Sequence, residues 1–239
     1  MDENLSFNEV SNETSEETDE KKKNYYEPLE EELRRDRVAL DNTLEDPSLQ
    51  GPFASYGLQL ERIQGFRVVW TNAESTFHKQ LSAYERQFEA TRFLADIRRR
   101  AGDELTRLSE VARIALKGNV DALQALGLKG KRSKGLGKWI QQAKHFYNNA
   151  LASPTILEAF ARYNVTPEDL QNGLQMILEV ETADTRQERA KGDAQKATEV
   201  RDAAFKELRE CMSEFYRIAK LAFADDRQQL EKLGIVAKS

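Results

Sequence analysis

The sequence predicts an all-α protein in which a tandem duplication forms an elongated antiparallel helical bundle or coiled coil, with clusters of short helices at its ends. Three observations lead to this prediction. Of the 239 residues 32% are charged, and only 5 are proline and 12 are glycine, which suits long solvated helices. A sequence segment that begins near residue 46 recurs 107 positions later, near residue 153. Each copy of the repeat also contains a stretch of nearly sixty residues without proline.

The first part of the chain differs in charge from the rest. Residues 1–46 contain 16 acids and 6 bases, whereas the whole chain has a net charge of −5. Residues 1–26 are predicted to be a disordered acidic tail, because they have too little apolar surface to offset the entropy of ordering. A first helix is expected at 27–44, "EPLEEELRRDRVALDNTL".

Several features predict a cytoplasmic protein without a membrane partner. No apolar run approaches the roughly 18 residues that a membrane span needs, and the N-terminus lacks the basic-then-apolar pattern of a signal peptide. The single cysteine, Cys211, agrees with a reducing compartment.

The duplication extends well beyond the repeated phrase. Residues 42–128 align without a gap to 149–235, with 18 identities in 87 positions. Identities lie at both ends, such as Pro47 with Pro154 and Gly127 with Gly234. An internal repeat of this kind predicts the domain organisation. After the tail come a first helical repeat with its leading helix (27–128), a basic linker with a linker helix (129–148) and a second repeat (149–239).

Capping residues predict where the helices of each repeat begin and end. Asp46-Pro47 and Ser153-Pro154 combine an N-cap with proline at the first helical position. The short helices should stop near Gly57 and Asn164, since these residues most easily adopt the left-handed C-cap conformation. Thr166-Pro167 then predicts a new helix, and "LQALGL" and "LEKLGI" should end a last short element at their glycines.

Apolar residues in the long proline-free stretches recur at three- and four-residue steps, which indicates a heptad seam. In the second repeat the seam runs through Ala194, Ala197, Ala204, Leu208, Cys211, Phe215, Ile218 and Ala222, with Arg201 as an interruption. An unbroken helix would be roughly 85 Å long, and the short linker then requires the two long helices to be antiparallel. The alternative is a hairpin that breaks near 84–88 and 191–193.

The sequence predicts neither an enzyme nor a cofactor or metal site. It contains no Walker loop, dinucleotide fingerprint, nucleophile elbow or Cys-x-x-Cys pair. The two histidines, His78 and His145, do not belong to Glu-x-x-His pairs, so a di-metal bundle would lack its imidazole ligands.

One segment could bind anions or nucleic acid. Residues 122–157 contain no Asp or Glu, and their bases include Lys129, Lys131, Arg132, Lys134 and Lys138. Basic loops with a nearby aromatic, here Trp139, can bind phosphates. The alternative interpretation is a solvated linker whose aromatic residues dock its helix on the bundle. Four further aromatics, Phe53, Tyr56, Phe160 and Tyr163, recur at equivalent positions and form either core packing or two peptide-binding grooves.

The stretches "FARYNV", "LQNGLQMILEVETAD" and "FYRIAKLAFADDRQQLEKLGI" resemble a family of uncharacterised bacterial helical proteins. This resemblance covers most of 42–239 and implies a bacterial origin, but no activity or ligand. The predicted function is therefore a non-catalytic helical scaffold or protein-interaction module, with a protein partner or self-association. The alternative function is a nucleic-acid or anion-binding protein that uses the basic 129–144 segment.

Overall fold

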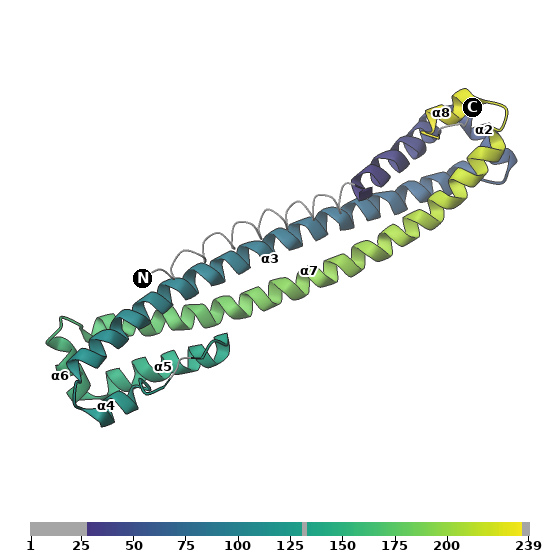
Figure 1. Ribbon diagram of the computed structural model, residues 1–239. Helices are drawn as coiled ribbons and strands as arrows, with labels where there is room; N and C mark the ends of the chain where they lie inside the picture. The colour runs from purple at the N-terminus through teal and green to yellow at the C-terminus, as the bar shows by residue number, and fades with distance from the viewer. Residues whose placement is uncertain (1–27, 131–132, 236–239) are drawn as a thin grey trace, which may run out of the picture. The chain divides into compact units, whose positions relative to one another are not determined.

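A computed structural model describes residues 28–130 and 133–235, which form eight α-helices and no strand (Figure 1). A leading helix covers residues 28–45. The other helices are α2 (Pro47–Ser55), α3 (Leu60–Ala115), α4 (Val120–Ala125), α5 (Leu136–Ala152), α6 (Pro154–Ala161), α7 (Pro167–Ala222) and α8 (Arg227–Lys232). The all-α prediction is confirmed, whereas the predicted tail at 1–26 lies outside the described residues.

The described residues fall into two compact units. Unit 1 contains residues 28–80 and 197–235, and unit 2 contains residues 81–130 and 133–196. The helices α3 and α7 contribute to both units. Unit 1 therefore joins the leading helix, α2 and the first part of α3 to the last part of α7 and to α8. Unit 2 joins α5, α6 and the first part of α7 to the last part of α3 and to α4.

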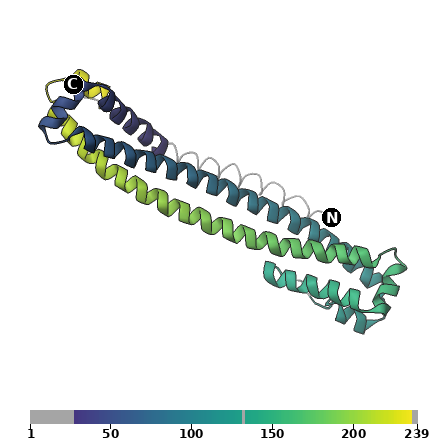
Figure 2. The same ribbon diagram turned by 180° about the vertical axis from the view of Figure 1, so that it is seen from behind.

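The helix bounds recur at an offset of 107 residues. This offset relates both ends of α3 to both ends of α7, and both ends of α4 to both ends of α8. The leading helix ends at residue 45 and α5 ends at residue 152, so the offset reaches these helices too. We call positions 107 residues apart matched positions. In two views the leading helix lies beside the first part of α3, while α4, α5 and α6 gather in unit 2 (Figures 1 and 2).

The predicted helix boundaries are confirmed by their caps. The Asp46 side chain accepts a hydrogen bond from the Ser48 backbone N–H at 2.9 Å, at the start of α2. Asn164, which follows α6, has a φ of 57°, in the left-handed region. Thr166 and Asp169 form a capping box before α7, in which each side chain accepts from the other residue's backbone N–H, at 3.2 and 2.8 Å.

The long helices are continuous, so the hairpin alternative is wrong. Both α3 and α7 are single helices of 56 residues. Within unit 1 they are antiparallel, because Arg62 forms an ion pair with Glu214 at 2.7 Å while Gln80 accepts a hydrogen bond from Arg201. Within unit 2 they are antiparallel as well, since Phe93 and Ala183 line one groove while Arg107 and Asp169 line another.

The predicted seam of α7 agrees only in part with the residues that are buried. Ala194, Ala204, Leu208 and Phe215 are buried as expected. Ala197, Cys211, Ile218 and Ala222, however, are only half-buried. Beyond Leu208, Met212, Ala219 and Phe223 are buried in addition to Phe215, each one position after a predicted seam residue. A helix has 3.6 residues per turn, so a strict 3.5-residue seam drifts around it unless the helix supercoils fully.

Arg201 does not interrupt this seam, contrary to the prediction. Its side chain is 1% exposed. The guanidinium donates from Nη1 to Gln80 Oε1 at 3.3 Å and from Nε to Asp202 Oδ1 at 2.9 Å. The burial is possible because the charged head group finds oxygen acceptors on both long helices of unit 1.

Aromatic packing holds the short helices in place. In unit 1 the Phe53 ring of α2 lies 4.9 Å from the Phe215 ring and 5.4 Å from the Phe223 ring. In unit 2 the Tyr147 ring of α5 lies directly against the backbone of α7. A Cβ atom built on Gly173 would lie only 2.4 Å from Tyr147 Cε1, so only glycine allows this approach.

Candidate functional site

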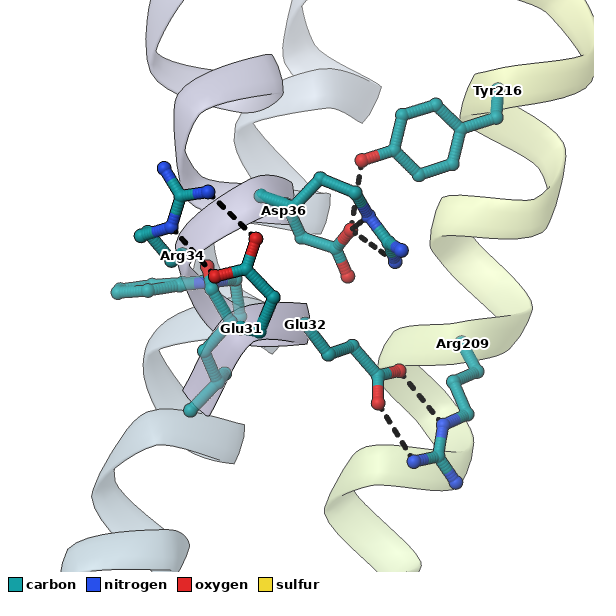
Figure 3. A network of polar contacts seen from close by, with 9 residues as sticks. Glu31, Glu32, Arg34, Asp36, Arg209 and Tyr216 are labelled. Carbon is teal, nitrogen blue, oxygen red and sulfur yellow. Dashed lines mark hydrogen bonds and ion pairs between the residues drawn. The ribbon is translucent and has the colours of Figure 1, made fainter. Parts of the chain in front are cut away.

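A polar network connects the leading helix to α7 in unit 1 (Figure 3). The buried Asp36 carboxylate accepts at Oδ1 from the Tyr216 hydroxyl at 2.8 Å and from Arg35 Nη2 at 3.0 Å. Close by, Arg209 donates to both carboxylate oxygens of Glu32 at 2.7 Å. Two polar connections, Asp36–Tyr216 and Glu32–Arg209, therefore join the leading helix to α7 in unit 1.

Burial controls the protonation of this network. It raises the pKa of the Asp36 carboxyl, against the opposing effects of the Tyr216 hydroxyl and the Arg35 charge. Burial also raises the pKa of Tyr216 far above its usual range. The phenol therefore stays protonated and donates a hydrogen bond to Asp36. Asp36 Oδ2 is buried and has no hydrogen-bond partner among the described residues.

The matched positions of unit 2 carry no ionisable groups. Asp36, Tyr216, Glu32 and Arg209 correspond to Ala143, Ser109, Trp139 and Gly102. A Cβ atom built on Gly102 would lie 3.9 Å from Trp139 Cζ2, so the indole occupies the place of the Glu32–Arg209 ion pair. A small cavity of about 50 Å³ lies beside Ser109. At these four positions the two units thus dock equivalent helices by different means, through ionisable groups in unit 1 and without them in unit 2.

The predicted anion-binding residues are only partly brought together. Lys129, Lys134 and Lys138 are exposed in unit 2, whereas Lys131 and Arg132 lie outside the described residues. Lys129 Nζ donates to the neutral Gln124 side chain at 3.3 Å. In contrast, Lys144 is half-buried and forms an ion pair with Glu181 at 2.6 Å.

Arg98 of α3 joins this basic segment from a distant part of the sequence. Its Nη2 atom lies 3.4 Å from the backbone carbonyl of Lys134. The two following arginines behave differently, because Arg99 and Arg100 both form ion pairs with Asp96. We call Arg98, Lys129, Lys134 and Lys138 the basic surface of unit 2.

The aromatic residues beside the basic surface belong to the core. Trp139, Phe146 and Tyr147 are buried, and they pack with Ala143 and Ala150 in the apolar core of unit 2. The expectation that these side chains dock the linker helix is confirmed. They are therefore not exposed for stacking on a ligand.

The four matched aromatics separate into two kinds. Phe53 and Phe160 are fully buried in the cores of their units, as the packing interpretation predicts. Tyr56 and Tyr163, in contrast, are 53% and 47% exposed. Another matched pair, Ile114 and Leu221 near the ends of α3 and α7, is 58% and 59% exposed. A third matched pair, Phe93 and Val200, is 47% and 48% exposed, so each unit displays three large apolar residues at matched positions, one of them a tyrosine.

Metal ligation, membrane spanning and thiol chemistry find no support among the described residues. Residues 28–130 and 133–235 contain no group of three or more His, Cys, Asp or Glu side chains arranged to hold a metal ion. None of their helices is both long and apolar enough to cross a bilayer. Burial, followed by nearby glutamates, raises the pKa of the Cys211 thiol, so its reactive thiolate form is disfavoured.

The chain matches no protein-family model, no curated protein and no solved structure. The resemblance to bacterial helical proteins therefore stays a prediction.

Sequence reasoning missed Asp36 and Arg98. Asp36 could have been found, because Leu33, Asp36, Leu40 and Thr43 follow three- and four-residue steps and are all buried. For Arg98 the sequence carries no such signal, since the contact depends on how α5 packs against α3.

Proposed function

We propose that this protein is a non-catalytic helical scaffold, built by tandem duplication, whose two units bind protein partners through related surfaces. Support for the duplication comes from the recurring helix bounds and from a pair of matched charges. Arg62 and Glu214 form an ion pair in unit 1 at 2.7 Å. The matched residues in unit 2 are Asp169 and Arg107, which also attract each other, with the two charges exchanged between the helices.

The observation that carries the binding role is the exposure of matched apolar residues. Tyr56 and Tyr163 are exposed, and so are Leu221 and Ile114. Burying such side chains is favourable by about 25 cal/mol per Å², so a partner that covers them would gain this free energy on either unit. Tyrosine is also among the residues that contribute most to protein interfaces.

The exposed tyrosine and the exposed aliphatic residue, Tyr56 and Leu221 in unit 1, lie at the same end of their unit. In unit 1 Tyr56 follows Phe53, whose ring contacts Phe223, and Leu221 precedes Phe223 by two positions. Tyr163 and Ile114 have the matched places in unit 2. A partner that presents an apolar side chain to such a surface could bind either unit, and a partner with two such segments could bind both.

Site-specific photocrosslinking tests this proposal. A photoreactive phenylalanine analogue is placed at Tyr56 or Tyr163 of the full chain in its native cells, and the adducts are identified by mass spectrometry. The matched controls are Glu61 and Glu168, which are identical in the two repeats and exposed. We expect both tyrosine positions to capture the same partner, or a second copy of the chain, and the glutamate positions to capture neither. Equal adducts at all four positions, or none at either tyrosine, would contradict the proposal.

A further inference from the structure

We infer a second binding activity: the basic surface of unit 2 binds the phosphate backbone of double-stranded nucleic acid. Arg98, Lys129, Lys134 and Lys138 all belong to unit 2, and Arg98 and Lys134 are in direct contact at 3.4 Å. None of the four forms an ion pair with a described carboxylate.

The basic surface stands out against an acidic chain. The chain has a net charge of −5, to which residues 81–196 contribute +4 and the remaining residues −9. No acid occurs between residues 122 and 157, the stretch that carries Lys129, Lys134 and Lys138. A polyanion attracted to this protein must therefore be attracted to a local cluster of bases and not to the chain as a whole.

Unit 1 has the opposite charge at the matched place. The first turn of α5 contains no acid and carries Lys138, whereas the matched position of the leading helix is Glu31, in the acidic run Glu30–Glu32. In unit 1 two of these acids are used in ion pairs, Glu31 with Arg34 at 2.6 Å and Glu32 with Arg209 at 2.7 Å. The first turn of this helix is therefore basic in unit 2 and acidic in unit 1. The fold does not require a lysine at the position of Lys138.

The surroundings of the four bases select the class of ligand. Proteins that bind single strands stack bases on exposed aromatic side chains, but Trp139, Phe146 and Tyr147 are buried. Lysine and arginine without such residues can still neutralise phosphates, and a duplex presents a phosphate charge every 1.7 Å or so along its axis. The contacts are then to the backbone and independent of base sequence.

Salt-dependent binding to a duplex tests this inference with the full chain. Binding to a fluorescent 20-base-pair DNA is measured by anisotropy between 50 and 200 mM NaCl. Four phosphate contacts predict that log K falls against log salt with a slope of about −3.6 or steeper. The variant Lys134→Gln/Lys138→Gln should reduce the slope by about 1.8 and weaken binding on the order of 50-fold at 0.1 M salt.

A charge-matched control separates the local surface from the net charge. Arg217→Gln/Lys220→Gln removes two exposed bases from α7 in unit 1 and should leave binding nearly unchanged. Circular dichroism checks that both variants keep their helical content. The inference is overturned by absence of duplex binding at 50 mM salt, by equal loss in both variants, or by equal or tighter binding to single strands. It is also overturned if anionic lipid vesicles bind the chain while duplex DNA does not. The photocrosslinking positions lie elsewhere, so either proposal can fail alone.

Discussion

The side-chain amide of Asn42 donates a hydrogen bond of 2.6 Å to the backbone carbonyl of Lys232, which lies 190 residues away in the sequence. Asn149 makes the same bond to the carbonyl of Ala125, also at 2.6 Å. Both donors and both acceptors are matched positions. Each bond satisfies a carbonyl at the end of a short helix, α8 or α4, and ties that helix to the end of the leading helix or of α5.

The equivalence of these bonds predicts similar energetic costs. Asn42→Ala and Asn149→Ala should each lower the free energy of unfolding by about 0.5–1.5 kcal/mol, the net value of one such hydrogen bond. Asn148→Ala, at an exposed position beside Asn149, should change it by less than about 0.5 kcal/mol. Urea unfolding followed by circular dichroism measures all three. If only one of the two substitutions, Asn42→Ala or Asn149→Ala, lowered the free energy of unfolding, the two bonds would not contribute equally to stability.

Gly173 should not tolerate even a methyl group. Since its Cβ would lie 2.4 Å from Tyr147 Cε1, we expect Gly173→Ala to cost about 1–3 kcal/mol through overpacking. Gly192→Ala on the same helix has no atom within 4 Å of its new Cβ and should stabilise the protein by about 0.5–1 kcal/mol.

A second substitution tests the cause of the Gly173 effect. The matched pair in unit 1 is Phe66 with Leu40, so Tyr147→Leu supplies the smaller residue that unit 1 already uses. Adding it to Gly173→Ala should recover part of the loss in chemical denaturation. Strict additivity of the two substitutions would rule out a direct clash.

Asp36 should make unfolding depend on pH in an unusual direction. Burial raises the pKa of this carboxyl above its ordinary 3.8 in the folded state, so folding favours its protonated form. Its contribution to stability is complete below about pH 3.8 and is lost as the pH rises through the folded-state pKa. Asp36→Asn cannot titrate, so its stability relative to the unmodified chain should increase between pH 4 and 7. A difference that stays constant with pH, in urea titrations, would contradict this assignment.

Asp46 should make stability depend on pH in the opposite direction. Hydrogen bonds from the Ser48 side chain, then from Lys232 and the Ser48 backbone, lower the pKa of Asp46 to about 2. Its contribution is present above pH 3.8 and is lost as the pH falls through 2. Asp46→Ser introduces the cap used at the matched Ser153, keeping the helix cap but not the ion pair with Lys232. Thermal unfolding should show a deficit at pH 7 that disappears toward pH 2, while Asp46→Ala should keep a deficit at both.

The sequence predicts the helix boundaries well because their causes are local. Pro47, Asn164 and the Thr166–Asp169 box each act within one turn of the helix that they begin or end. The continuity of α3 and α7 follows in the same way from the absence of proline. These features can be read without knowing what packs against what.

Contacts between helices are harder to predict. The burial of Arg201 depends on Gln80, a residue on a different helix, and so could not be read from the spacing along α7. The Tyr147–Gly173 contact has a signal in the sequence. Tyr147 is larger than its matched residue Leu40, whereas Gly173 is smaller than its matched residue Phe66. For the basic surface the lysines were visible in the sequence, and the docking of Trp139 was one of two interpretations, but the position of Arg98 was not visible.

The division of the chain between the units also sets an order of events during synthesis. Unit 2 is one contiguous stretch, residues 81–196, so all of its helices are available before the last part of the chain is made. Unit 1 begins earlier in the sequence, but it lacks its share of α7 and all of α8 until residues 197–235 emerge. The segment translated first is thus completed last, and until then Phe53 is without Phe215 and Phe223. Once residue 196 has left the ribosome, the nascent chain would hold a folded unit 2 and an open unit 1 with its apolar face uncovered.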